Sequence, residues 1–370
     1  MKILIPILNF ARAGGCRVLS ELANQWVKLG HEVAFLCPDS SDEPYFPTIA
    51  KIVWVNDKGA IFDLRTVFPR PSGRYHLQAL FFGLKAIGAQ YDLIFANHSL
   101  TAWPVALVRC GNARKIYYVQ AYEPEYFINM RTAKDYILAA ISALSYHFPI
   151  KKVVNSPIYF KYKNLRATEF VAPGMNLDIF KPLEPPRDIQ NSESIIIGCI
   201  GRHEPEKGTI YVLRAFEQLN RLDKRFRLRV AYGNLPDGWQ HEQCEVVVPR
   251  NDKELADYYR SVDILIAPGT VQHGAPHYPV LEGLACGAAV VTTGYMGATP
   301  DTAWIVKNQD IQSIVDNVLA IRSDPVARAR KITMGIQVAQ DFSWSEVAKK
   351  MMGIIDRLAP STNRKNDRVA

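Results

Sequence analysis

Short apolar runs alternate along the first half of the chain with segments whose apolar residues recur three and four positions apart. The segment from Val18 to Leu29 has this spacing and ends at Gly30, so it predicts a helix at residues 17–29. Uninterrupted apolar runs are typical of strands that are buried on both faces of a parallel sheet. Such strands are predicted at residues 2–8, 32–37, 52–55, 92–96, 115–119, 153–155 and 168–171, with a further helix at about 75–88.

Residues 173–194 interrupt this alternation. They contain four prolines, few large apolar side chains and no regular period, which is typical of a linker. Strands are predicted again at residues 195–200, 227–231, 245–248, 264–267 and 288–292, and late helices at about 311–321 and 345–358. The pattern therefore predicts an α/β protein of two domains, residues 1–172 and 195–342, each built on a doubly wound parallel sheet.

The cysteine content indicates the cellular location. The six cysteines are scattered without a CxxC pair, which favours reduced thiols and a cytoplasmic location. We expect neither a secretory signal nor a membrane span, because the apolar segments are too short for either. The polar and charged residues 359–370 are predicted to be a disordered tail.

Charge is distributed unevenly. Residues 1–175 contain 20 Lys and Arg against 12 Asp and Glu, whereas residues 176–370 contain 24 of each. A basic first half favours an anionic partner, such as a membrane surface or a phosphorylated acceptor, although drift in surface composition would also explain it. No nucleic-acid recognition motif is evident, so nucleic acid is not the expected partner.

A loop with two cations follows the strand predicted at residues 195–200. Arg202 and Lys207 lie between Gly201 and Gly208, and a helical pattern of apolar residues follows. The carboxyl end of a strand and the start of a helix form the place where α/β domains bind anionic ligands. An Arg can hold two oxygens while a Lys adds a point charge, so the loop suits a diphosphate; the alternative is a solvated turn.

A second segment, Pro-Val-Leu-Glu-Gly-Leu-Ala-Cys-Gly at residues 279–287, precedes an apolar strand. We expect a short helix to begin near Glu282, with Pro279 just before its start, and to end at Gly287. A carboxylate at such a junction either caps the helix or binds the two hydroxyls of a ribose.

The order and spacing of these motifs resemble the retaining glycosyltransferases of family 4, which have the GT-B fold. In that family the Arg and Lys hold the donor diphosphate and the Glu holds the nucleotide ribose. Gly14-Gly15, a loose linker signature at residues 174–180 and the closing helix after Phe342 also match. The resemblance implies two Rossmann-like domains facing across a cleft. Residues 1–172 would bind the acceptor, residues 195–342 would bind the nucleotide sugar, and a helix at 343–358 would return to the first domain.

The resemblance implies a set of site residues and three departures. Gln120 stands where the family has a His, and His98 only roughly matches a His-rich turn. Gly274 replaces a sugar-binding Glu, which leaves the backbone or another side chain, with His273 and His277 as candidates, to contact the sugar. The runs around Tyr122 and Tyr278 are similar to a branch with bacterial rhamnosyltransferases. Donor binding is predicted for Gly15, Gly201, Arg202, Lys207, His277, Tyr278, Pro279, Val280, Leu281 and Glu282, and catalytic roles for Arg202, Lys207, Gln120 and His98.

The expected reaction is transfer of a sugar, with retention, from a nucleotide-diphosphate sugar to a glycan or lipid-linked acceptor. It would serve cell-surface polysaccharide or glycolipid assembly, with peripheral contact of the basic first half at the inner membrane face. No cofactor or metal is expected, because there is no Asp-x-Asp and Pro276 separates His273 from His277. The alternatives are a nucleotide-sugar epimerase of the same architecture and a non-catalytic nucleotide-sugar-binding relative. A dinucleotide oxidoreductase is the least favoured alternative, because no GxGxxG follows the first strand.

Overall fold

Two sheets organise the chain, each within its own compact unit. The computed structural model describes residues 1–65, 73–130 and 132–358, so the tail predicted to be disordered lies outside the described residues. One unit comprises Met1–Pro173 together with the segment from Trp344 onward, and the other comprises Gly174–Ser343.

The first unit contains an eight-stranded sheet, in the described residues, with the order β4-β3-β2-β1-β5-β6-β7-β8. Neighbouring strands are parallel, apart from the antiparallel pair of β3 and β4. Successive side chains of a strand point to opposite faces, so Ile3 and Ile5 join one apolar core and Leu4 joins the other. The strands are β1 (Lys2–Pro6), β2 (Glu32–Pro38), β3 (Lys51–Val55), β4 (Ile61–Phe62), β5 (Leu93–Ala96), β6 (Arg114–Val119), β7 (Lys151–Val154) and β8 (Glu169–Phe170).

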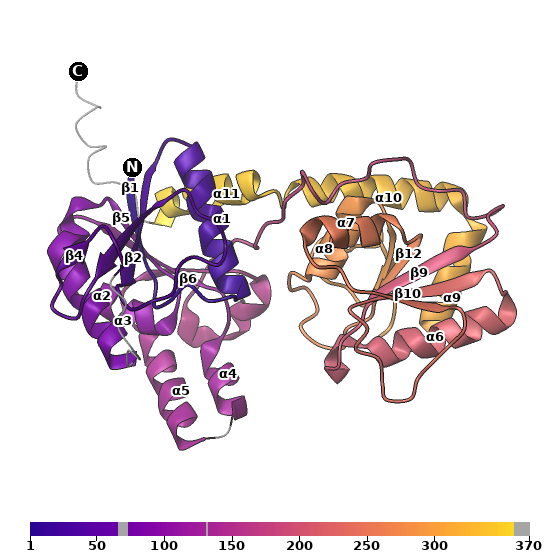
Figure 1. The fold of residues 1–370 in the computed structure, drawn as a ribbon, viewed down its shortest axis with the longest axis horizontal. Helices are drawn as coiled ribbons and strands as arrows, with labels where there is room; N and C mark the ends of the chain where they lie inside the picture. Colours follow the sequence, from indigo (N-terminus) through magenta and orange to yellow (C-terminus); the bar gives the residue numbers. More distant parts are fainter. Residues whose placement is uncertain (66–72, 131, 359–370) are drawn as a thin grey trace. The chain divides into compact units, whose positions relative to one another are not determined.

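Helices cover both faces of this sheet (Figure 1). The C-terminal helix α11 packs on α1: the indole Nε1 of the buried Trp26 donates to the carbonyl of Ala348 at 3.4 Å. Met351 and Ile355 of α11 therefore belong to the first unit's core. The helices are α1 (Gly14–Lys28), α2 (Gly73–Ile87), α3 (Ser99–Leu107), α4 (Glu123–Met130), α5 (Ala133–Ser145) and α11 (Trp344–Leu358), with 3-10 turns η1 (Gly88–Gln90), η2 (Pro157–Lys161) and η3 (Lys163–Leu165).

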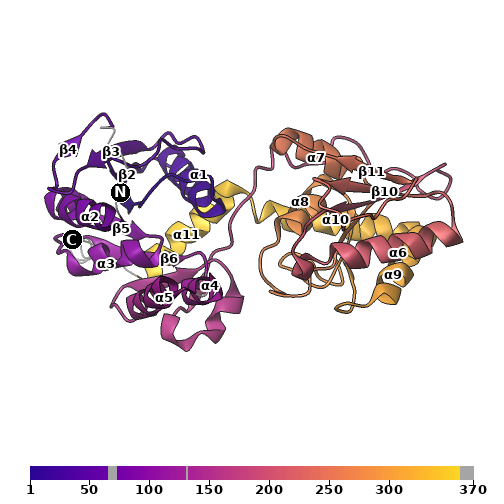
Figure 2. The ribbon, with the colours of Figure 1, turned by 60° about the horizontal axis from the view of Figure 1, so that its bottom comes forward.

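The second unit has a six-stranded parallel sheet, in the described residues, with the order β11-β10-β9-β12-β13-β14. The chain runs outward from β9 to β11 and then returns to the other side of β9, so the direction reverses between β9 and β12. Ligands of doubly wound sheets bind at the carboxyl ends of the strands beside such a reversal. Figure 2 shows α6 and α9 together along this sheet. The elements are β9 (Ile195–Ile200), η4 (Pro205–Lys207), α6 (Thr209–Leu222), β10 (Phe226–Ala231), β11 (Cys244–Val247), α7 (Asp252–Arg260), β12 (Ile264–Ala267), α8 (Tyr278–Cys286), β13 (Ala289–Thr292), β14 (Trp304–Ile305), α9 (Ile311–Ser323) and α10 (Pro325–Gln340).

Residues 173–194, predicted as a linker, form no helix or strand of the described structure, and from Gly174 onward they belong to the second unit. Phe180 and Ile189 are both buried there. The guanidinium of Arg260 donates to the carbonyls of Ile179 and Lys181 at 3.0 and 3.1 Å, which fixes the first part of this segment.

The prediction of an α/β protein with two parallel sheets is confirmed, and each predicted strand is present with small shifts at its ends. Several elements were missed: β4 and β14 are only two residues long, and α3, α4, α5, α7 and α10 were not predicted. The helix α3 is apolar around most of its circumference and contains Pro104, so it lacks the alternation that reveals an amphipathic helix. In the described parts of the chain, no helix combines the length and apolarity needed to span a bilayer.

Candidate functional site

A cavity of about 240 Å³ opens at the carboxyl ends of β9 and β12, where the strand order reverses. Its walls come from the last residues of both strands, the cationic loop after β9 and the segment that begins α8. The lining residues are Cys199, Ile200, Arg202, Lys207, Thr209, Val212, Ile266, Ala267, Pro268, Pro276, His277, Tyr278 and Pro279. The structure thus brings five of the predicted site residues, Arg202, Lys207, His277, Tyr278 and Pro279, to one cavity.

Two glycines allow the cationic loop to lie close to the neighbouring backbone. A Cβ on Gly201 would lie 1.7 Å from the carbonyl oxygen of Gly233, and one on Gly208 would lie 2.5 Å from that of Pro268. Gly208 also has a φ of +80°, a left-handed conformation that disfavours other residues. Thr209 then closes the loop, because its hydroxyl accepts from the Arg202 N–H at 3.0 Å and donates to the Arg202 carbonyl at 2.9 Å.

The guanidinium of Arg202 is held by a carboxylate that sequence reasoning missed. Its Nε lies 3.1 Å from Glu204 Oε2, and its Nη2 lies 2.5 Å from Oε1. The hydrogen bond from Arg202 lowers the pKa of Glu204 to about 2, so the pair is ionised at neutral pH. Both side chains are nearly half exposed, so an anionic ligand can compete with Glu204 for the guanidinium.

His277 is a neutral polar group in a cationic environment. Its ring stacks on Tyr295 with centroids 4.4 Å apart, and its buried Nδ1 has no hydrogen-bond partner among the described residues. Burial, and then the charges of Lys207 and Arg202, lower the pKa of His277 to about 3. His277 can therefore offer a hydrogen bond to an anion without adding charge. Tyr295 is a further residue that the sequence did not identify.

The predicted residues of α8 divide into cavity and core. Tyr278 and Pro279 line the cavity, whereas Val280 and Leu281 are 0% and 1% exposed and pack inside the unit. Pro279 has no N–H, and the N–H groups of Val280 and Leu281 both donate to the carbonyl of His277 at 3.0 and 3.1 Å. These three residues therefore offer no free backbone N–H group to a ligand, and the first turn of α8 contributes to the cavity mainly through its side chains.

Glu282 lies deeper than its prediction assumed. The helix α8 begins at Tyr278, so Glu282 is one turn inside it and not at its start. The carboxylate is buried and accepts from the Tyr259 hydroxyl at 3.0 Å, and Glu282 is absent from the cavity lining that the described residues provide. A contact with ribose stays a prediction, and Tyr259 is a partner that could not be read from the sequence.

Gly274 has a structural reason to be glycine. Its φ is +81° and its N–H donates to the carbonyl of Gly294 at 2.8 Å, so the chain turns there in a conformation that other residues rarely adopt. The nearby His273 bonds to the carbonyl of Gly269 at 3.0 Å. Across the described residues, no cluster of three or more His, Cys, Asp and Glu side chains could hold a metal ion.

The predicted residues of the first unit lie at the carboxyl ends of β1, β5 and β6. Gly15 is in the first turn of α1, and its carbonyl accepts from the amide of Gln120 at 3.3 Å. Asn155 donates to the Gln120 carbonyl at 2.6 Å, while its own Oδ1 is buried without a partner in the described structure. These amides form a polar surface at the edge of the first sheet.

His98 precedes α3 and caps it. Its Nδ1 accepts from the N–H of Leu100 at 3.1 Å and lies 3.7 Å from Glu123 Oε2. Glu123 is buried, and its two carboxylate oxygens share the N–H of Ser99 in a bifurcated hydrogen bond, each at 3.0 Å. No pattern in the sequence indicated that this carboxylate supports the turn of His98. The structure thus places His98, Gln120 and Gly15 in the first unit and the residues around Arg202 in the second.

Comparisons with known proteins agree with this architecture. The family described as Glycosyltransferase Family 4 matches residues 13–152, and Glycosyl transferases group 1 matches residues 194–324. A D-inositol 3-phosphate glycosyltransferase of Frankia alni is 26% identical over 211 residues, which are 50% of this chain and 51% of that protein. The chain spans about half the length of the curated relatives it matches.

Solved structures are similar over nearly the whole chain. Sucrose-phosphate synthase from Thermosynechococcus elongatus has a TM-score of 0.68 at 18% identity and covers 96% of this chain and 98% of its own. HepE from Anabaena, solved with UDP, has a TM-score of 0.69 at 14% identity, with 96% and 100% covered. The fold and these matches define a glycosyltransferase with the GT-B fold. The chain belongs to glycosyltransferase family 4.

Proposed function

We propose that this enzyme transfers a sugar from a nucleotide-diphosphate sugar to a hydroxyl of a glycan or lipid-linked acceptor and retains the anomeric configuration. The observation that carries the proposal is the cavity at the reversal point of the second sheet, where Arg202, Lys207 and His277 meet. The UDP bound to HepE, a protein of the same fold, supports a nucleotide donor. The segments around Tyr122 and Tyr278 make a deoxyhexose one candidate for the donor sugar.

Bond cleavage leaves negative charge on the departing nucleoside diphosphate. Arg202 and Lys207 would stabilise this charge electrostatically, which in enzymes is worth a few kcal/mol for each well-placed group. The guanidinium must first exchange Glu204 for phosphate oxygens, and His277 would add a neutral hydrogen bond. This arrangement would need no metal, and the departing phosphate oxygen would accept the proton of the acceptor hydroxyl.

The first unit would bind the acceptor. His98 and Gln120 lie at the carboxyl edge of its sheet, and both present groups that can hydrogen-bond sugar hydroxyls. The positive charge of residues 1–175 favours an acceptor that is anionic or that lies on an anionic membrane. Work at the inner membrane face, in polysaccharide or glycolipid assembly, is the cellular role that this charge supports.

Replacing Lys207 by Ala tests the donor site. The kcat for sugar transfer is expected to fall by about 10²–10³-fold, because one preorganised cation is lost where charge develops. Lys253→Ala, on an exposed position of α7, is the matched control and should leave the rate unchanged. Initial rates with a panel of nucleotide sugars, with melting temperatures as the check on folding, give the comparison.

Two results would count against the proposal. A folded Lys207→Ala enzyme with unchanged kcat would remove Lys207 from the mechanism. The anomeric configuration of the new glycosidic bond, read by NMR and compared with that of the donor sugar, decides retention: an inverted product would exclude the retaining reaction while leaving the donor site intact.

A further inference from the structure

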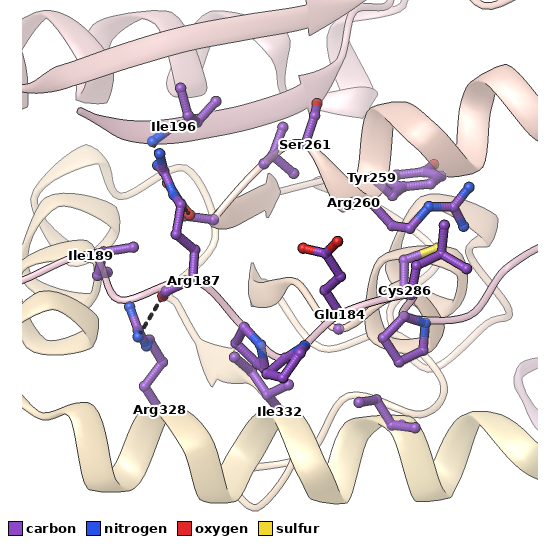
Figure 3. Close-up of a pocket in the computed structure, with 18 of the residues that line it drawn as sticks. Glu184, Arg187, Ile189, Ile196, Tyr259, Arg260, Ser261, Cys286, Arg328 and Ile332 are labelled. Atoms are coloured by element: carbon purple, nitrogen blue, oxygen red, sulfur yellow. Dashed lines mark hydrogen bonds and ion pairs between the residues drawn. The ribbon is translucent and has the colours of Figure 1, made fainter. Parts of the chain in front are cut away.

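The second unit contains a larger cavity, of about 970 Å³, at the opposite edge of its sheet (Figure 3). Ile196 near the start of β9, Asp263 just before β12 and Cys286 shortly before β13 all line it, so it opens at the amino ends of the strands. The 240 Å³ cavity that we propose as the donor site lies at the carboxyl ends of β9 and β12 and shares no lining residue with the larger cavity. The two cavities are therefore distinct sites of one unit.

One wall of this cavity carries a buried cation. Arg328 of α10 is 8% exposed, and its Nη2 donates to the carbonyl of Arg187 at 2.9 Å. Among the described residues, no carboxylate forms an ion pair with Arg328: Asp263 already binds Arg187, at 2.5 Å, and the N–H of Ile196, at 2.7 Å. Burial lowers the pKa of Arg328 although the carboxylates of Asp263 and Asp188 act to raise it, so the charge is compensated only in part.

The remaining walls are of two kinds. Ile189, Ile332 and Ile336 provide apolar surface, together with prolines of the segment before β9. Four arginines and two carboxylates also line the cavity. Arg187, Arg229 and Arg260 pair with Asp263, Glu245 and Asp257, so Arg328 is the one of these four arginines without an ion pair in the described structure. Figure 3 shows the Glu184 side chain directed into the open space, with Arg187 and Arg328 on one side and Cys286 on the other.

We propose that this cavity is a second ligand site that binds a small organic anion with a hydrocarbon body. The anionic group would pair with the guanidinium of Arg328, and the body would cover the isoleucine and proline wall. A charge-assisted hydrogen bond to a buried guanidinium gains more than an exposed one, because water does not compete with it. The volume suits a ligand of ordinary small-molecule size. The inference concerns a site separate from the donor site and does not depend on the proposed reaction.

Calorimetric titration of the full-length protein with hexyl phosphate tests the proposal. Inorganic phosphate lacks the hydrocarbon body and 1-hexanol lacks the charge, so hexyl phosphate should bind at least tenfold more tightly than either. Arg328→Met should weaken hexyl phosphate binding tenfold or more, whereas Lys207→Ala in the donor site should not change it. Glu184→Gln, at an exposed position, should strengthen binding several-fold by removing a repulsive charge.

Each result of these titrations either supports or contradicts the second ligand site. Equal affinities for hexyl phosphate and inorganic phosphate, displacement of hexyl phosphate by UDP, or an Arg328→Met protein that is folded and binds normally would each overturn the site. If Arg328→Met does not fold, Glu184→Gln decides: unchanged or weaker binding in that variant contradicts the proposal, and tighter binding supports it.

Discussion

Single side chains in and beside the cavity at β9 and β12 have their charge set by close neighbours. His277 is neutral because its surroundings are apolar and cationic, and Glu204 is ionised because Arg202 donates to it. The types of these residues are visible in the sequence, but their protonation follows from contacts across the fold. Two predictions concern these charges.

His277 is expected to stay neutral throughout the pH range in which the enzyme would be assayed. Its pKa is lowered from 6.5 to about 3, so the unfolded chain binds a proton between these values that the folded chain does not. The contribution of neutral His277 to the free energy of unfolding is therefore fully present above about pH 6.5 and is lost as the pH drops toward 3. NMR titration of the histidine rings, with His277→Phe to assign the signal, measures this directly. A His277 signal that titrates near its ordinary value would contradict the burial of this ring.

Removing the competitor of the donor phosphate should tighten donor binding. In Glu204→Gln the guanidinium of Arg202 loses its ionised partner, and since an exposed ion pair is worth up to about 1 kcal/mol, the KM for the donor should fall about twofold to fivefold. Steady-state kinetics over a range of donor concentrations gives this value. Glu254→Gln, which breaks an exposed pair with Arg250, is the control. A raised KM in Glu204→Gln would mean that Glu204 positions Arg202 productively.

At the scale of elements, turns and helix ends place the site. The cationic loop enters α6 through Gly208, and α8 begins one residue after His277, so both functional segments are held where a helix starts. Helices with a clear apolar face, such as α1 and α11, could be predicted closely from spacing. The helices α7 and α10 were missed although Asn251 and Asp324 cap them and Pro325 opens α10, which are signals that a search for caps would have found.

Two glycines should respond to alanine with opposite signs. Gly201→Ala would place a Cβ against the Gly233 carbonyl and should destabilise the second unit by about 1–3 kcal/mol or more. Gly353→Ala lies at an exposed position inside α11 with no close neighbour, and should stabilise the first unit by roughly 0.5–1 kcal/mol. Differential scanning calorimetry reports both shifts in Tm. A Gly201→Ala protein with an unchanged Tm would show that the loop can move away from Gly233.

At the scale of the whole molecule, basic charge and exposed apolar side chains occur together in the first unit. The excess of basic residues lies in the first half of the sequence. The same unit exposes Tyr126 of α4, and Tyr136 and Ile137 of α5, by more than half of their surface. Basic charge combined with exposed aromatic and aliphatic side chains suits contact with an anionic membrane.

Anionic vesicles should therefore bind the protein through the first unit. Co-sedimentation with phosphatidylglycerol vesicles is expected at low salt and should weaken as salt is added, while phosphatidylcholine vesicles bind little. Ile137→Asp should reduce binding severalfold, whereas Val326→Asp, at an exposed position of the second unit, should not. If the wild-type protein does not co-sediment with anionic vesicles even at low salt, the proposed membrane contact is wrong, and the proposed sugar transfer is unaffected.

The sequence by itself determined the fold class, most strands and the two segments that line the cavity beside β9 and β12, because alternation, apolar runs and glycine-bounded loops are local properties. Only the tertiary structure decided which side chains meet. It placed Arg202 and Lys207 beside His277, paired Arg202 with Glu204 and drew Glu282 toward Tyr259, since such contacts join residues from different elements. The buried cation of Arg328 likewise became visible only when α10 packed against the segment before β9, because burial depends on the packing of the whole unit.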